Sequence, residues 1–212
     1  MHRPAPRRPR LLAALIALTA CSGGRTAAPP EAVAVSAQPC TSPNRALGLG
    51  VVVADDLVAT AAHTVEGPLR DLRVDGRPAT LVAVDARTDL ALLAAPGVGI
   101  EPAELSDRAP SSATLLTPGA EQPVELVSTG PLVVHDTTAG LRHERQVHRI
   151  SPAVASGTSG APLVDDDDHL LGIVVLSEPA DDIAYAVTAG ELEALIEDRP
   201  VSALPAPVEC PG

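Results

Sequence analysis

The sequence predicts an all-β protein, a barrel or a sandwich, that is closed by one C-terminal helix. Short aliphatic runs of four to eight residues recur from about residue 41 to residue 187, and Gly, Pro, Asp or Asn separates them. Runs of this length between turn residues are typical of antiparallel strands, whereas βαβ units would need helical segments between the strands. Hydrophobic residues make up 45% of the 212 residues, which is enough for one large core or two small ones.

The predicted strands follow one another without an internal repeat. In chain order they are ALGLGVVVA, LVATAA, LRVDG, ATLVAVD, LALLAA, ATLLTPG, PVELVSTG, PLVVHD, QVHRI, PLVDD, LLGIVVL and IAYAVT. The acidic run DDDDH at 165–169 lacks the alternation and the glycine of an EF-hand loop, which argues against a calcium site of that kind. Thr188 and Glu191 have the spacing of a capping box ahead of ELEALIEDR, which predicts a helix over 188–199.

The first 20 residues are expected to be a signal peptide. Four arginines within residues 1–10 precede the apolar run LLAALIALTA, which is too short to span a bilayer as a helix. The tetrad LTAC that ends at Cys21 resembles the lipobox of bacterial lipoproteins, in which the cysteine becomes the lipidated N-terminus. This resemblance implies an extracytoplasmic protein that Cys21 anchors to a bacterial cell membrane. A plain secretory signal that is cut nearby is the alternative.

The charge of the chain argues against nucleic acid as a partner. Lys and Arg number 15 against 27 Asp and Glu, and removal of the signal peptide takes four of the arginines. A domain this acidic repels phosphate groups, and it has no basic patch for anionic lipid. Membrane association is therefore expected only through the lipid on Cys21.

The three cysteines predict one disulfide. If Cys21 is acylated, Cys40 and Cys210 remain, and an oxidising compartment favours their pairing; two free thiols are the alternative. Between Cys21 and Cys40 the residues are small and rich in proline, which predicts a flexible tether over 21–40. The folded part is therefore expected to begin at about residue 41.

Three polar residues stand in an order that indicates nucleophilic catalysis. Ser159 lies in SGTSGAPLV, and a serine hydroxyl needs a base to activate it and an acid to orient that base. His63 directly follows an aliphatic strand in VATAAHTVEG, and Asp89 opens another strand in TDLALL. Asp85 in VAVDART is the nearest alternative acid, although its position fits a hairpin turn.

The blocks TAAH, TDLALL and GTSGAPLV resemble the three catalytic blocks of the trypsin-like serine proteases. The stretches GLGVVVADDLVATAAHTVEG and VAVDARTDLALL are especially similar to the bacterial HtrA-type branch. The resemblance implies a chymotrypsin-like fold of two six-stranded antiparallel Greek-key barrels, at 41–110 and, with the helix, at 111–199. A tail at 200–212 would then carry Cys210. This tail is too short for the PDZ module that HtrA-type proteins usually carry, so none is expected.

The resemblance also implies a role for each residue of the site. His63 would act as general base and acid, Asp89 would orient its imidazole, and Ser159 would attack the scissile carbonyl. The backbone N–H groups of Gly157 and Ser159 would form the oxyanion hole. The expected activity is that of a serine endopeptidase that acts on a protein or peptide through an acyl-enzyme, with no cofactor and no metal.

Substrate preference follows from the same resemblance. Ala153, six residues before the serine, would lie at the base of the primary specificity pocket, and Val175, Leu176 and Ser177 would form the opposite wall. An uncharged base argues against cleavage after Lys or Arg and favours small or medium aliphatic side chains.

Three further points come from the residues around the serine. Thr158 stands where many trypsin-like enzymes have the acid that pairs with a newly cut N-terminus, so we expect activity without zymogen cleavage. The motif GTSGA also resembles the nucleophile elbow of α/β-hydrolases, but that fold places its Asp and then its His after the serine, and only His169 follows Ser159. A non-catalytic binding module on the same fold, with a collapsed oxyanion loop, is the remaining alternative.

Overall fold

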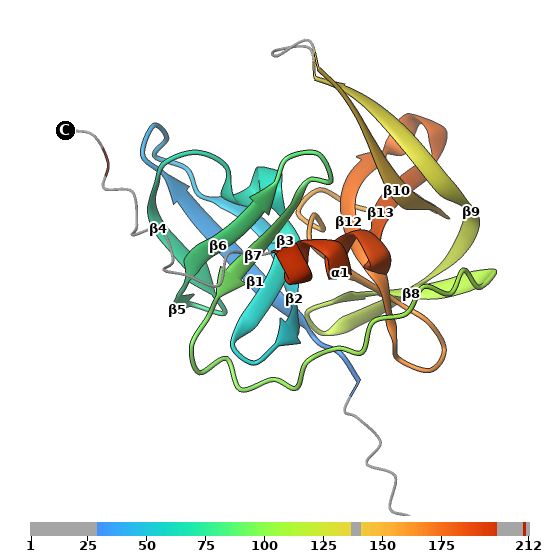
Figure 1. Cartoon of the computed structure of the whole chain (residues 1–212), viewed down its shortest axis with the longest axis horizontal. Coiled ribbons are helices and arrows are strands. Elements are labelled where there is room, and N and C mark those ends of the chain that lie inside the picture. Colours follow the sequence, from blue (N-terminus) through green and yellow to red (C-terminus); the bar gives the residue numbers. More distant parts are fainter. Residues whose placement is uncertain (1–28, 137–140, 199–209, 211–212) are drawn as a thin grey trace, which may run out of the picture.

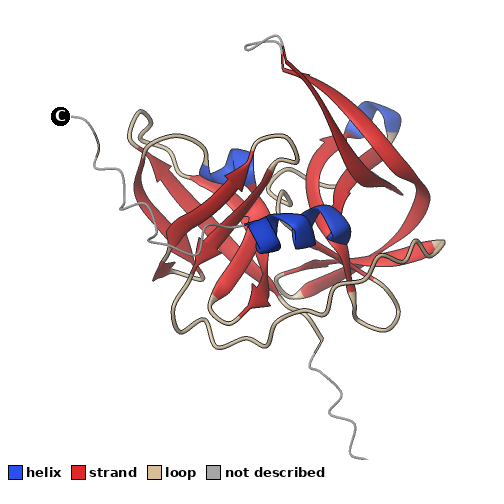
Figure 2. Cartoon of the chain, in the orientation of Figure 1, coloured by secondary structure: helices blue, strands red, loops and turns tan. Residues whose placement is uncertain are grey.

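In the computed structural model, the residues described are 29–136, 141–198 and 210. They form two antiparallel β-sheets, with a single α-helix lying across the junction between them (Figures 1 and 2). The predicted signal peptide, Cys21 and most of the predicted tail lie outside the described residues. Within those residues, no helix is long and apolar enough to cross a membrane.

The first sheet has seven strands in the order β5-β4-β1-β2-β3-β7-β6. A short 3-10 helix, η1 (Ala62–Val65), follows β3 directly. The strands are β1 (Ala32–Pro39), β2 (Ala46–Ala54), β3 (Leu57–Ala61), β4 (Leu69–Val74), β5 (Arg77–Pro78), β6 (Thr80–Asp85) and β7 (Leu90–Ala94).

The second sheet is a closed six-stranded barrel in the order β10-β13-β12-β11-β8-β9, as the sequence predicted. The 3-10 helix η2 (Pro179–Asp181) lies between β12 and β13. The strands are β8 (Ser112–Thr117), β9 (Ala120–Asp136), β10 (Leu141–Ser151), β11 (Pro162–Val164), β12 (Leu170–Glu178) and β13 (Ile183–Thr188). The predicted boundary at residue 110 lies in the connection between β7 and β8.

The N-terminal boundary differs from the prediction, because β1 occupies part of the segment expected to be a tether. In AVAVSAQP the side chains of Val33, Val35 and Ala37 are almost fully buried, and their neighbours are more exposed. This alternation is typical of a half-buried strand, and the small residues and prolines around it obscured the signal.

The first sheet also has seven strands where six were expected. Asp75 and Gly76, with φ of 47° and 74°, form a two-residue turn after β4. Asp-Gly favours such turns because both central residues need a positive φ. The turn returns the chain as the two-residue strand β5, which pairs with the end of β4 and supplies the seventh strand.

The largest core cluster joins the two sheets. It contains Leu90 and Leu92 of β7, Ile173 of β12, Val187 of β13 and Leu192 of the helix α1 (Ala189–Asp198). Two further clusters fill the first sheet and the second barrel separately. The aliphatic side chains of the sequence therefore form a shared interface in addition to the two separate cores.

The helix α1 is held by its buried face and by an ion pair, not by the predicted capping box. The Glu191 carboxylate accepts hydrogen bonds from Arg87 Nη2 at 2.8 Å and from the Gln146 N–H at 3.0 Å. Both partners lie outside the helix, and Arg87 belongs to the turn before β7. The helix thus contacts both sheets.

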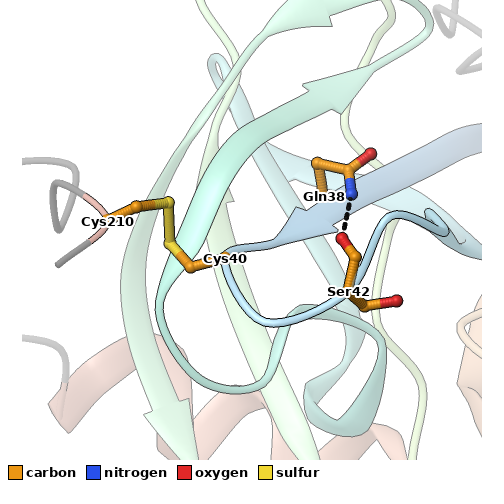
Figure 3. Close-up of a disulfide and its surroundings, with 4 residues drawn as sticks. All are labelled: Gln38, Cys40, Ser42 and Cys210. Carbon is orange, nitrogen blue, oxygen red and sulfur yellow. Dashed lines mark hydrogen bonds between the residues drawn. A yellow bond between two sulfur atoms is a disulfide. The ribbon is translucent and has the colours of Figure 1, made fainter. Parts of the chain in front are cut away.

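Cys40 and Cys210 form the predicted disulfide, with their Cα atoms 5.4 Å apart (Figure 3). The bond links the residue that follows β1 to a point 170 residues further along the chain. Beside it, Gln38 Nε2 donates a hydrogen bond to the Ser42 backbone oxygen, and the Cys40 N–H donates to the Pro68 oxygen. The C-terminal cysteine is thereby fixed to the first sheet.

Candidate active site

Strand pairing brings His63 and Asp89 together, although 26 residues separate them in the chain. Strands β3 and β7 are antiparallel, with Ala61 opposite Leu90. A residue just after β3 must therefore lie beside a residue just before β7, and these residues are His63 in η1 and Asp89 in the turn. Asp89 has φ +63°, a left-handed conformation that Asp tolerates better than most residues.

Three hydrogen bonds hold Asp89 against the start of η1. Its Oδ2 lies 2.8 Å from His63 Nδ1, its Oδ1 accepts the His63 N–H at 2.9 Å, and its backbone oxygen accepts the Ala62 N–H at 2.9 Å. A carboxylate can only accept, so Nδ1 carries the hydrogen and Nε2 is left with the lone pair. The bond to Asp89 raises the pKa of His63 above its ordinary value of 6.5, although burial opposes this.

The backbone around Ser159 is fixed to strands of both sheets. The Leu49 N–H of β2 donates to the Ser159 oxygen at 2.7 Å, and the Gly160 N–H donates to the Val174 oxygen of β12 at 2.7 Å. Gly160 has φ +90°, and a Cβ there would lie 1.8 Å from the Leu49 oxygen. Only glycine fits this close approach, so the packing against β2 requires the glycine that follows Ser159.

His63, Asp89 and Ser159 line one cavity of about 540 Å³. The structure therefore brings together the three residues that the sequence singled out. In the part of the chain described, no hydrogen bond joins the Ser159 hydroxyl to His63. Such bonds are often long without substrate and tighten when it binds, so the arrangement fits a site at rest.

The loop before the serine presents two free backbone donors. The Thr158 N–H and hydroxyl both donate to the Ala155 oxygen, at 3.4 and 2.7 Å, which closes a turn over 155–158. Gly157 is the third residue of this turn and has φ +90°, as a type II turn requires. Among the described residues, the N–H groups of Gly157 and Ser159 have no hydrogen-bond partner.

Three of the four residues expected in the specificity pocket line the cavity. Val175, Leu176 and Ser177 line the cavity, and Ala153 is not among the lining residues. The Ala153 N–H donates to Asp182 Oδ1 at 3.1 Å. Its neighbour Val154, only 5% exposed, lines the cavity.

The alternative acid Asp85 closes a turn, as its position suggested. Its Oδ1 accepts the Arg87 N–H at 2.9 Å, and its Oδ2 accepts the Thr88 hydroxyl at 2.9 Å. These bonds shape the turn between β6 and β7 that presents Asp89. Within the described residues, Asp85 has no hydrogen bond to His63.

The acidic turn between β11 and β12 is closed by its own bonds. Asp165, Asp167 and His169 could approach a common cation, since their ligand atoms lie within 4.8 Å of one another. However, Arg108 Nη1 lies 2.9 Å from Asp167 Oδ2 and 3.6 Å from Asp165 Oδ2. Asp165 Oδ1 also accepts the N–H groups of Asp167 and His169. The negative charge therefore already has a cationic partner.

One residue of the cavity was missed by sequence reasoning. Arg145 of β10 has a side chain only 6% exposed, and its Nη1 lies 3.8 Å from Asp89 Oδ2. The only signal in the sequence is alternation, because Arg145 shares a strand face with the buried Val147. Its contact with Asp89 depends on how the two sheets face each other, and no local pattern reports this.

The family of the chain follows from its sequence. A model of the trypsin-like peptidase domain matches residues 48–173, more than half of the chain. The chain belongs to the trypsin-like peptidase domain family. By family it is a serine endopeptidase, as the sequence predicted. A search of curated proteins finds no match.

Solved structures of proteases show the same fold. The active form of the Rv3671c protease from M. tuberculosis has a TM-score of 0.73 at 24% identity, over 85% of this chain and 86% of that one. The HtrA-type protease AlgW with tripeptide has a TM-score of 0.62 at 20% identity, over 81% and 60%. The serine endoprotease from Yersinia pestis has a TM-score of 0.54 at 23% identity, over 82% and 65%. The likeness to these proteins is one of chymotrypsin-like fold.

Proposed function

We propose that this peptidase is an extracytoplasmic, lipid-anchored serine endopeptidase that works through His63, Asp89 and Ser159. The observation that carries the proposal is the pair of hydrogen bonds between Asp89 and His63, in the same cavity as Ser159. These bonds fix the position of the imidazole ring and determine which ring nitrogen can accept a proton.

In the proposed mechanism, His63 Nε2 takes the proton of the Ser159 hydroxyl as the oxygen attacks the scissile carbonyl. The imidazolium that forms is stabilised by the Asp89 carboxylate at Nδ1. Its Nε2–H then protonates the leaving amine, which leaves an acyl-enzyme on Ser159. A water molecule, deprotonated by the same nitrogen, then attacks the acyl carbon; the bond to Ser159 breaks, Nε2–H returns the proton to the Ser159 oxygen, and the acid product is released.

The loop over 155–158 favours an enzyme over a binding module. A collapsed loop would direct the N–H of Gly157 away from the cavity or bind it internally. Here the positive φ of Gly157 and the unpaired N–H groups of Gly157 and Ser159 support a formed oxyanion hole. Thr158 holds this turn through Ala155, so no newly cut N-terminus is needed for the loop to form.

The lining of the cavity supports cleavage after small or medium aliphatic residues. Among the described lining residues, Asp89 is the only carboxylate, and His63 already binds it, so none remains to pair with a substrate Lys or Arg. The Ser177 hydroxyl donates to the Val154 oxygen at 2.9 Å and accepts the Val154 N–H at 3.2 Å. These two hydrogen bonds join the segment before the serine loop to β12, beside the cavity that both residues line.

Anchoring at Cys21 would place the catalytic domain close to the bilayer. Because β1 begins at Ala32, only residues 22–31 separate it from the lipidated cysteine. A segment of this length spans at most about 35 Å when fully extended. The enzyme would therefore act on substrates at or near the membrane surface.

Labelling with a fluorophosphonate probe tests the activity. The protein without its signal peptide should be labelled, and Ser159→Ala and His63→Ala should not be, while both variants keep the unfolding midpoint of the parent. An unlabelled parent that is folded and disulfide-bonded would favour the binding module. For the anchor, the N-terminal peptide of the membrane-bound protein should carry acyl mass on Cys21, and Cys21→Ala should release the protein from the membrane fraction.

A further inference from the structure

We propose that Arg145 acts on His63 through Asp89: it reaches from the second barrel to the turn that presents Asp89, places a positive charge beside the carboxylate, and thereby sets the pH range in which the site works. The inference rests on the proposed function, because it concerns the same histidine. It adds to that function a residue that acts through Asp89.

The contact crosses the junction between the two sheets. Arg145 lies on β10, and its Nη1 donates to the Thr88 oxygen at 3.0 Å, on the turn that presents Asp89. The same nitrogen lies 3.8 Å from Asp89 Oδ2, the oxygen that binds His63 Nδ1. Asp89 Oδ2 is therefore placed between the imidazole and the guanidinium.

Burial of the Arg145 guanidinium costs free energy of desolvation, which argues against a role in packing alone. A buried guanidinium loses its hydration, and an apolar side chain of similar volume is often as stable or more stable at such a site. Arg145 Nε is buried with no hydrogen-bond partner in the described structure, so the desolvation is not fully compensated. The one ion pair that Arg145 forms among the described residues is with Asp89.

A separate ion pair already joins the same elements. Arg87 binds Glu191 of α1 through two nitrogens, at 2.8 and 3.3 Å, and its Nη1 donates to the Glu144 oxygen of β10 at 3.1 Å. The turn before β7, β10 and α1 are thus connected without Arg145. This pair does not involve Asp89, so Arg87 provides a matched control for the general effect of breaking a contact across the junction.

The charges that face His63 give the expected direction. Asp89 and Glu66 raise the pKa of His63, and the positive Arg145 lowers it. Loss of the Arg145 charge should therefore raise the pKa of His63 further, and a catalytic base that is protonated at higher pH works over a narrower range.

The test compares Arg145→Met and Arg145→Gln, which remove the charge, with Arg145→Lys, which keeps it, and with the control Arg87→Met. The titration of His63 is followed by NMR of its ring, so the readout does not depend on activity. Both neutral variants should titrate at higher pH than the parent, Arg145→Lys should stay closer to the parent, and Arg87→Met should match it. The ratio of kcat/KM at about pH 6 to kcat/KM at about pH 8.5 should fall by at least about threefold in the two neutral variants. It should fall less in Arg145→Lys and stay unchanged in Arg87→Met.

An unchanged His63 titration in a folded neutral variant overturns the inference. Failure of both neutral variants to fold overturns it as well, because Arg145 would then serve stability alone. If the parent protein hydrolyses nothing, the proposed function fails, and the NMR titration still decides the role of Arg145.

Discussion

Gly160→Ala should damage catalysis through a single methyl group. A Cβ added at position 160 would lie 1.8 Å from the Leu49 oxygen, whereas ordinary contacts begin at 3.4 Å, so the serine loop and β2 must separate by about 1.5 Å. A displacement of about 1 Å can cost roughly 100-fold in rate, so we expect kcat/KM to fall by at least about 100-fold. Overpacking and the positive φ together should destabilise the fold by about 2 to 5 kcal/mol.

Gly119→Ala is the matched control for this prediction. Gly119 has a similar φ of +78°, lies in the turn between β8 and β9, and has no atom within 4 Å of an added Cβ. It should lose about 1 to 2 kcal/mol of stability from backbone strain and keep full activity. Urea unfolding and hydrolysis of a peptide with an aliphatic residue before the scissile bond measure both effects. A folded Gly160→Ala enzyme with the activity of the parent would refute the argument.

Three further predictions concern covalent and titratable groups. Replacing both Cys40 and Cys210 by serine should lower the free energy of unfolding, measured in urea, by up to about 5 kcal/mol, because the disulfide closes a span of 170 residues. An unchanged free energy of unfolding would contradict the argument that the disulfide restricts the conformational entropy of the unfolded chain. The acid limb of kcat/KM should have its midpoint above pH 6.5, because the pKa of His63 is raised and its neutral form is the base; a midpoint at or below 6.5 contradicts this. Burial lowers the pKa of His148, so the unfolded state binds the proton first and stability should decrease as the pH falls below about 6.5. His148→Gln should weaken that dependence in thermal unfolding from about pH 5 to about pH 7, and an unaltered slope would exclude His148 as its source.

The sequence predicted the parts of the site that depend on local pattern. His63, Asp89 and Ser159 each stand at the edge of an aliphatic run, so strand boundaries and chain order identified them together. The disulfide and the C-terminal helix were also predicted, because composition and helical periodicity are properties of short segments.

The features that were missed depend on contacts between distant segments. Arg145 can approach Asp89 only because β10 faces the turn before β7. The hydrogen bonds from Arg87 and Gln146 to Glu191 depend on the same arrangement of distant segments. Val154 lines the cavity and Ala153 does not, a one-residue difference that the resemblance did not predict. The strand β1 is the exception, since its alternation was visible and was outweighed by the surrounding prolines.

The hydrogen bond from the Leu49 N–H to the Ser159 oxygen attaches the serine loop to the first sheet as well as to the second barrel. Ser159 belongs to the second barrel by chain order, yet through Leu49 it is attached to β2, the neighbour of the strand that leads into His63. The serine loop is therefore hydrogen-bonded to the strand next to the one that leads into the base. The Leu49 amide hydrogen would exchange with solvent only when the serine loop undocks, so this one backbone group reports the integrity of the site without any substrate.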